Sequence, residues 1–255
     1  PPNLIPLMHP RACCLALAPL LFAALAAQPV PPDWSLPGSA THHQVPPPAG
    51  FHRPTVTWDR PIGIFEGQSD VGGPLVAGNA WYYPDTGRYV IRSAGYNIWY
   101  FRDEFHFLWK RMRGNVTLAA DIAFPNPAGY DDRKVVLIMR QDLDDNAKEV
   151  MVALHGRGLI HLAYRPAKGA DIKEAFHIDH RTNGRERLGI EKRGDTYALL
   201  LSLAGESLHV QGSTVDLHLR APFYVGIGFC SHQPVTSDTA VVSRVTLVNA
   251  ARDLP

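Results

Sequence analysis

Cysteine is scarce in this chain of 255 residues, which contains only Cys13, Cys14 and Cys230. A disulfide-rich scaffold is therefore excluded, and the folded part must depend on an apolar core. An excess of one charge is also missing, because 25 basic residues stand against 24 acidic ones. Such an excess is the usual mark of nucleic-acid binding, so we predict no nucleic-acid partner.

Long hydrophobic runs are missing with one exception, Ala12–Ala27, which carries no charge. It follows Arg11 and ends in the small-x-small pattern Ala24-Leu25-Ala26. These features predict a secretory signal peptide over residues 1–26, which could also start at Met8. The alternative interpretation of the run is an uncleaved membrane anchor. The run is short for a bilayer-spanning helix, which needs about 20 residues. We therefore expect a secreted or periplasmic protein with no membrane span in the mature chain.

Cleavage after Ala26 would leave a neutral chain with Cys230 as its single cysteine. Residues 27–54 are rich in proline and poor in apolar side chains, which predicts an extended linker. His42 and His43 lie in this linker and could bind a metal weakly, but a solvated linker is the favoured interpretation. A tail follows the domain at residues 251–255.

From residue 55 to about 250 the chain changes to short apolar or alternating runs separated by Gly, Asp and Asn. This spacing, without a long segment of helical period, predicts an all-β sandwich or barrel. The best helix candidate, Ala147–Ala153, runs into a β-branched stretch. The expected strands are Gly87–Ser93, Glu104–Lys110, Val116–Phe124, Lys134–Arg140, Val150–His155, Leu159–Arg165, Arg187–Lys192, Thr196–Leu203, Leu208–Gln211, Val215–Leu219, Phe223–Cys230 and Ala240–Val248.

The two-residue period of strands divides these segments into faces. Lys134–Arg140 is apolar on both faces and is expected to be a central strand. In Phe223–His232 one alternate set is apolar, whereas the other contains Gly226, Gly228 and His232. Leu159–Arg165 and Val150–His155 likewise place small residues beside His and Arg. A concave face open to a polar ligand explains this pattern, and so do glycines that ease sheet curvature.

Seven segments stand out by their order and spacing: Gly95–Trp99, Asp103–Lys110, Gly114–Leu118, Lys134–Gln141, Ala153–Gly156, Leu188–Asp195 and Tyr224–His232. Together they resemble a bacterial family of concanavalin A-like jelly-roll domains, the DUF1349 type. The resemblance implies a two-sheet antiparallel jelly-roll sandwich with a concave face, and relatives of this kind are exported. Position 115 departs from the family, because relatives have Asp where this chain has Asn115.

Enzymes of this jelly roll often place a pair of catalytic carboxylates on one strand as Glu-x-Asp-x-x-Glu, and this motif is missing. Asp103 and Glu104 are adjacent, so they would point to opposite faces of a strand. Glu66 with Asp70, and Asp131 with Asp132, are expected in loops. A Gly-x-Ser-x-Gly elbow, a P-loop and a His-Glu-x-x-His motif are missing too. We lean towards a protein without catalytic activity.

The chain also offers two weak metal sites. Asp142, Asp144, Asp145 and Asn146 form an oxygen-rich group, but the ligand set is incomplete for calcium. We predict no cofactor and keep Ca²⁺ in this loop as an alternative. His177 and His180 would face opposite ways on a strand, which favours a polar surface stretch.

The sequence therefore predicts a binding module for a carbohydrate or another extracytoplasmic polymer. Sugars stack on aromatic rings and are oriented by polar side chains. The predicted ligand-binding residues are Arg140, His155, Arg165, His232, Trp99 and Asp103. One alternative is a glycoside hydrolase or polysaccharide lyase, with His155 or His232 as base and Arg140 neutralising an acidic sugar. Another is a protein-interaction module of the cell envelope.

Overall fold

A computed structural model describes residues 46–47, 50–179, 186–202 and 207–249. The predicted signal peptide, most of the linker with His42 and His43, His180 and the tail lie outside the described residues. The described part of the chain is all β, and it contains no helix long and apolar enough to cross a bilayer. The helix candidate Ala147–Ala153 is not helical, because its residues from Glu149 onward begin a strand that is buried on both faces.

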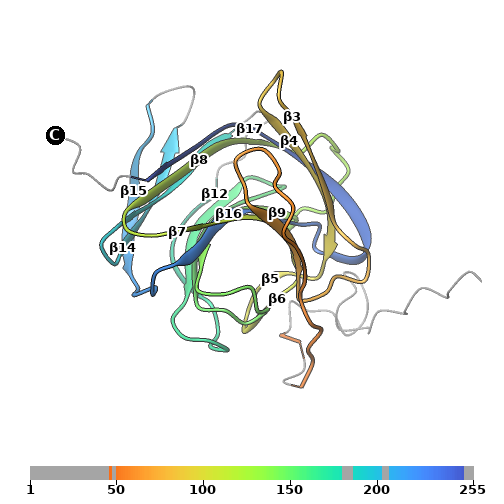
Figure 1. Cartoon of the computed structure of the whole chain (residues 1–255), viewed down its shortest axis with the longest axis horizontal. Helices are drawn as coiled ribbons and strands as arrows, with labels where there is room; N and C mark the ends of the chain where they lie inside the picture. The colour runs from red at the N-terminus through yellow and green to blue at the C-terminus, as the bar shows by residue number, and fades with distance from the viewer. Residues whose placement is uncertain (1–45, 48–49, 180–185, 203–206, 250–255) are drawn as a thin grey trace, which may run out of the picture.

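Two antiparallel sheets form a jelly-roll sandwich of the concanavalin A-like type, and a short hairpin lies outside them (Figure 1). The eight-stranded sheet has the order β1-β2-β7-β16-β9-β10-β11-β12. Its strands are β1 (Val56–Trp58), β2 (Gly67–Val71), β7 (Phe105–Met112), β16 (Phe223–Cys230), β9 (Lys134–Arg140), β10 (Glu149–His155), β11 (Leu159–Arg165) and β12 (Lys173–Asp179).

The seven-stranded sheet has the order β15-β14-β13-β8-β17-β4-β3. Its strands are β15 (His209–Asp216), β14 (Thr196–Ser202), β13 (Glu186–Arg193), β8 (Val116–Ala123), β17 (Gln233–Asn249), β4 (Arg88–Gly95) and β3 (Asn79–Tyr83). The hairpin pairs β5 (Ile98–Trp99) with β6 (Arg102–Asp103). Figure 1 shows this hairpin on the side of the eight-stranded sheet that faces away from the other sheet.

The main core fills the space between the two sheets. It contains the apolar set predicted for β16, namely Phe223, Val225, Ile227 and Phe229. Ile160 and Leu162 of β11 also belong to it, which confirms the faces derived from the two-residue period. The prediction that Lys134–Arg140 is a central strand is confirmed as well, because β9 lies between β16 and β10 and is buried throughout.

Apart from the two short hairpin strands, four strands were not predicted, namely β1, β2, β3 and β12. Asp70, assigned to a loop with Glu66, instead lies in β2, where its carboxylate oxygen is 2.7 Å from Nδ1 of the buried His106. The two strands predicted at Leu208–Gln211 and Val215–Leu219 form one strand, β15, in which Gly212 has a φ of 66°. That positive φ suits glycine and marks an irregularity within the strand.

Asn115 connects two turns at one end of the seven-stranded sheet. Its side-chain oxygen accepts a hydrogen bond of 2.8 Å from the backbone N–H of Gly194. Asn115 precedes β8, and Gly194 lies in the turn between β13 and β14. An amide oxygen accepts this bond as a carboxylate would, so the departure from the family pattern at this position keeps the turn contact.

Candidate functional site

Four fully buried ionic side chains lie on the outer face of the eight-stranded sheet, beneath the hairpin. Asp103 of β6 accepts hydrogen bonds of 2.8 Å from Arg140 and 2.6 Å from Arg165. Glu149 of β10 lies 2.5 Å from Arg140 and 2.9 Å from Arg165. All four side chains have no exposed surface. Two guanidinium groups thus face two carboxylates, and this cluster ties the hairpin to the sheet.

The same arginines also satisfy backbone carbonyl groups of the covering loops. Arg165 donates 2.8 Å to the carbonyl of Ala147 and 3.3 Å to that of Tyr100, while Arg140 donates to that of Asp144. Burial alone would raise the pKa of Asp103, but Arg165 and Arg140 outweigh it and hold this pKa below its ordinary value. The structure therefore places Arg140, Arg165 and Asp103 in a structural clamp without solvent contact.

The glycines of β16 do not leave open space on this face. A Cβ atom at Gly226 would lie 1.8 Å from the carbonyl oxygen of Leu108, and one at Gly228 would lie 2.4 Å from the ring of Phe105. Cys230 is buried on the same face and donates its thiol hydrogen to the carbonyl of Gly95. The small residues thus admit neighbouring side chains and backbone, and the centre of the face is packed.

A cavity of about 390 Å³ opens beside the hairpin, over the ends of β9, β10 and β11. We call it the hairpin cavity. Trp99, His155 and His232, the other three predicted site residues, all line it. The remaining lining residues are Asn97, Tyr100, Asp132, Lys134, Arg157, Leu159, His161 and Glu174. The sequence prediction therefore divides between two places, a buried clamp and a cavity that reaches solvent.

Aromatic side chains of the hairpin form one wall of the cavity. Trp99 and Tyr100 are both partly exposed, and the ring of Trp99 lies 5.1 Å from that of His161. Tyr100 has a φ of 54°, which few residues other than glycine adopt. The other tryptophans among the described residues are elsewhere: Trp109 is buried and donates to Ser69, and Trp58 and Trp81 are exposed on β1 and β3.

Two nearly buried histidines form the floor of the cavity. The rings of His155 and His161 meet edge-on at 5.1 Å, and these residues are 6% and 2% exposed. Nδ1 of His155 lies 3.7 Å from Asp132, which is too long for a hydrogen bond. Among the described residues neither ring nitrogen of His155 has a hydrogen-bond partner. Burial lowers the pKa of His155 to about 4 and that of His161 well below its ordinary value, so both rings are neutral at pH 7.

Lys134 brings a cation to the inner end of the cavity. Its ammonium group donates 2.8 Å to the side-chain oxygen of Asn97 and lies 5.6 Å from the centre of the Trp99 ring. Burial lowers the pKa of Lys134 to about 8. The predicted site residues did not include Lys134 and His161, although the sequence pattern places both on the same strand faces as predicted site residues. Lys134 shares the face of Arg140 at the start of an otherwise apolar strand, and His161 shares the face of Arg165.

His232 completes the cavity from the end of β16. It has a φ of 62°, and its ring stacks on that of Tyr130 at 5.2 Å with 7° between the planes. Only three described residues other than glycine have a positive φ, and two of them, Tyr100 and His232, line this cavity. Such conformations cost about 1–3 kcal/mol each and cluster at functional sites.

The acidic loop after β9 faces cations of the protein. Asp145 lies 2.8 Å from Arg102 and 2.9 Å from His52, while Asp142 and Asp144 both contact Lys168. Within the described ranges no three His, Cys, Asp or Glu side chains converge as metal ligands. His177, half of the second weak metal motif, lies on β12 and contacts Glu174 at 2.6 Å.

Comparisons with known proteins connect the chain to a fold and to no family. No protein-family model matches it, and no curated protein matches it. The solved structures similar to it include a functionally unknown protein from Saccharomyces cerevisiae, at a TM-score of 0.50 and 14% identity, covering 67% of this chain and 91% of that one.

Another similar structure is a xylan β-1,4-xylosidase from Bacillus halodurans C-125, at a TM-score of 0.50 and 12% identity, with 71% of this chain matching 39% of that one. The carbohydrate-binding module CBM66 from Bacillus subtilis matches at a TM-score of 0.44 and 14% identity, covering 68% of this chain and 92% of that one. Identities this low show the fold alone, so membership of the DUF1349 type stays a prediction.

Proposed function

We propose that this protein is an exported binding module that holds a carbohydrate in the hairpin cavity. The observation that carries the proposal is the combination, in one cavity, of exposed aromatic faces with a buried imidazole, His155, that has no hydrogen-bond partner among the described residues. Small-molecule sites usually join apolar walls to a few convergent polar groups in this way.

The chemistry of the lining suits a sugar. Trp99 and Tyr100 offer ring faces to the C–H side of a pyranose. A neutral imidazole has one donor and one acceptor nitrogen, and a sugar hydroxyl group can serve either. Lys134 and Asn97 add a cation and an amide beside them. The three predicted site residues that lie in the clamp, Asp103, Arg140 and Arg165, act indirectly in this proposal, because they hold the hairpin that carries Trp99 and Tyr100.

The wider context agrees with this proposal without carrying it. The similar xylosidase acts on xylan by its name, but the likeness is one of fold. The apolar run at Ala12–Ala27 supports export, and polysaccharides are ligands available outside the cytoplasm. The balance of 25 basic and 24 acidic residues favours directed hydrogen bonds and stacking over a purely electrostatic partner.

The test is titration calorimetry of the protein with a panel of soluble polysaccharides and oligosaccharides, followed by two tryptophan variants. Trp99→Ala should weaken the best ligand at least about tenfold, since one stacked ring contributes roughly 1–3 kcal/mol. Trp81→Ala is the matched control, because Trp81 is 43% exposed on β3 in the other sheet. No saturable binding across the panel, or equal affinity in Trp99→Ala, would contradict the proposal.

One observation favours a second function, eliminative cleavage of an acidic polysaccharide. A neutral His155 can take the proton beside a uronate carboxyl group, and Lys134 can neutralise that carboxylate. The glycosidic C–O bond then breaks, a C=C bond forms in the sugar, and the leaving oxygen gains a proton. Arg140, previously assigned the neutralising role, is fully buried in the clamp. Release of an unsaturated, ultraviolet-absorbing product, abolished in His155→Asn while binding persists, would distinguish cleavage from binding alone.

A further inference from the structure

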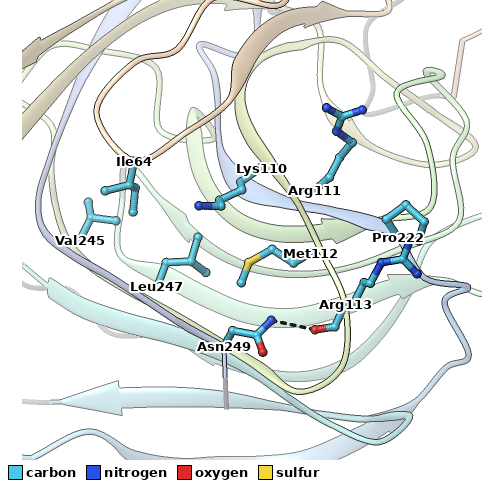
Figure 2. Close-up of a pocket in the computed structure, with 9 residues that line it drawn as sticks. All are labelled: Ile64, Lys110, Arg111, Met112, Arg113, Pro222, Val245, Leu247 and Asn249. Atoms are coloured by element: carbon cyan, nitrogen blue, oxygen red, sulfur yellow. Dashed lines mark hydrogen bonds between the residues drawn. The ribbon is translucent and has the colours of Figure 1, made fainter. Parts of the chain in front are cut away.

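A second and larger cavity, of about 840 Å³, opens between the two sheets on the opposite side of β7 from the hairpin. We call it the inter-sheet pocket. Lys110 and Met112 of β7 line it, facing Val245, Leu247 and Asn249 of β17 (Figure 2). Ile64, Arg111, Arg113 and Pro222 complete the lining. A hydrogen bond of 2.8 Å from Asn249 to the carbonyl of Arg113 closes one end.

An irregularity in β17 turns its apolar side chains into this pocket. Ala240 and Val242, in the middle of the strand, face the core, and the register with β8 shifts between Ser243 and Thr246. After the shift Val245 and Leu247 pack against the core instead, because one added residue exchanges the two faces of a strand. The interior of the sandwich therefore continues as an apolar surface to its open end, where Ile64 is 40% exposed.

The charge around this apolar surface has one sign. Three of the nine lining residues are basic, Lys110, Arg111 and Arg113, and none is acidic. Arg111 is paired with Glu66 at 3.3 Å and points away from the apolar residues in Figure 2. No carboxylate of the described residues lies within ion-pair distance of Lys110 or Arg113. In a chain with balanced charge, this local excess of cations is complementary to an anion.

Lys110 joins the apolar and the charged parts of the pocket. It lies on the inner face of β7 between Leu108 and Met112, which both belong to the main core. In Figure 2 its side chain extends towards the side of the pocket on which Ile64, Val245 and Leu247 lie. The stem of Lys110 borders an open space whose volume is within the usual range for ligand sites, about 300–1,000 Å³. A lysine that only extended its charged end to solvent would need no such cavity beside its stem.

We propose that the inter-sheet pocket binds an anionic amphiphile, a single alkyl chain that ends in a carboxylate. The alkyl chain would lie along Met112, Val245, Leu247 and Ile64. The carboxylate would pair with Lys110, and Arg113, on the Pro222 side of the pocket, would add to the local positive charge. This site is separate from the hairpin cavity and shares no lining residue with it.

The proposal predicts two independent contributions to affinity. Each added methylene group should tighten binding about fourfold, the equivalent of burying one CH₂. Removing the head-group charge or the lysine charge should weaken binding about tenfold or more, because hydrogen bonds to charged groups are stronger than neutral ones. Surface adsorption of a detergent would show the first dependence without the second.

The experiment titrates the protein with octanoate, decanoate and dodecanoate, each below its micelle-forming concentration, and with decanol as the uncharged comparison. We expect saturable binding, a gain of about fourfold per methylene and weaker binding of decanol than of decanoate. Lys110→Met should lose about tenfold for decanoate while keeping the wild-type unfolding midpoint. Ile64→Ser, at an exposed position, should weaken binding by loss of apolar contact.

Lys173→Met is the matched control, because Lys173 is exposed on β12, at the far edge of the same sheet. It should bind decanoate like the wild type, and so should Trp99→Ala. Absence of saturable binding, equal binding of decanol and decanoate, or unchanged affinity in Lys110→Met would each overturn the proposal.

Discussion

Replacing Asp103 by asparagine tests the buried clamp directly. The substitution keeps the shape of the side chain and removes one of two carboxylates that face Arg140 and Arg165, leaving two buried guanidinium groups beside Glu149 alone. Loss of one partner from a buried ion pair costs about 3–5 kcal/mol, because the remaining charge stays away from water. Since whole domains are stable by only about 5–15 kcal/mol, Asp103→Asn should lower the free energy of unfolding by a large fraction.

Urea denaturation at pH 7 measures this loss as a lower midpoint with an unchanged slope. Asp144→Asn is the matched control, because Asp144 is paired with Lys168 at the surface and its side chain is 60% exposed. Exposed pairs contribute about 0–1 kcal/mol, so this control should stay near the wild type. A loss in Asp103→Asn no larger than that in Asp144→Asn would refute the clamp.

The pH dependence of the difference in stability between wild type and Asp103→Asn provides a second test of the clamp. The two arginines hold the pKa of Asp103 below its ordinary value in the folded state. Its contribution to stability is therefore present above the unfolded pKa of about 4 and is lost as the pH falls through the folded pKa. The gap between the stability of the wild type and that of Asp103→Asn should shrink in strong acid, as Asp103 becomes protonated in the folded wild type.

Three further predictions concern the surroundings of the clamp and the cavity. Burial raises the pKa of Glu104 to about 7 despite its contact with Arg53, so its contribution to stability is present below pH 4.5 and is lost as the pH rises through 7. Glu104→Gln should remove that loss, roughly 2–3 kcal/mol between pH 5 and pH 8, when unfolding midpoints are compared at the two pH values. In an NMR titration the His155 ring should stay neutral down to about pH 4, and titration near pH 6.5 would contradict its burial. Because the pKa is lowered in the folded state, the contribution of this ring to stability should be lost as the pH falls from 6.5 towards 4. Gly226→Ala should destabilise by about 3 kcal/mol or more, because the new methyl group meets the Leu108 carbonyl, while Gly50→Ala, with nothing within 4 Å, should be neutral in the same denaturation assay.

Periodicity made the longer strands predictable, and the limits of that prediction follow from the same rule. β9, β10, β11 and β16 were located with their faces because buried strands alternate or are apolar throughout. β2 was missed because its sequence, Gly-Gln-Ser-Asp-Val, is polar. Its interior place depends on partners from distant segments, such as His106 for Asp70 and Trp109 for Ser69. No local pattern encodes such partners.

Periodicity likewise predicted only part of the candidate site. Alternation placed Arg140, Arg165, His155 and His232 on one face correctly, since all four lie on the side of the sheet that the hairpin covers. The two-residue hairpin strands β5 and β6 are too short to give a periodic signal. Without the hairpin, nothing in the pattern separates arginines that would meet a ligand from arginines that meet Asp103.

The clamp and the cavity are linked by the hairpin, and this link has a consequence for binding. Asp103 lies in β6 and Trp99 in β5, and residues 99 and 102 pair across the hairpin. The backbone carbonyl of Tyr100, between these strands, accepts a hydrogen bond from Arg165. A substitution in the clamp should therefore disturb the aromatic wall even though no clamp side chain lines the cavity.

If the hairpin cavity is the ligand site, Asp103→Asn should weaken the affinity for the ligand that the wild type binds, under conditions where the protein remains folded. Trp99→Ala should add little to that loss, because both substitutions act on one wall. If the losses of affinity caused by the two substitutions were fully additive, the clamp would not affect ligand binding through the hairpin.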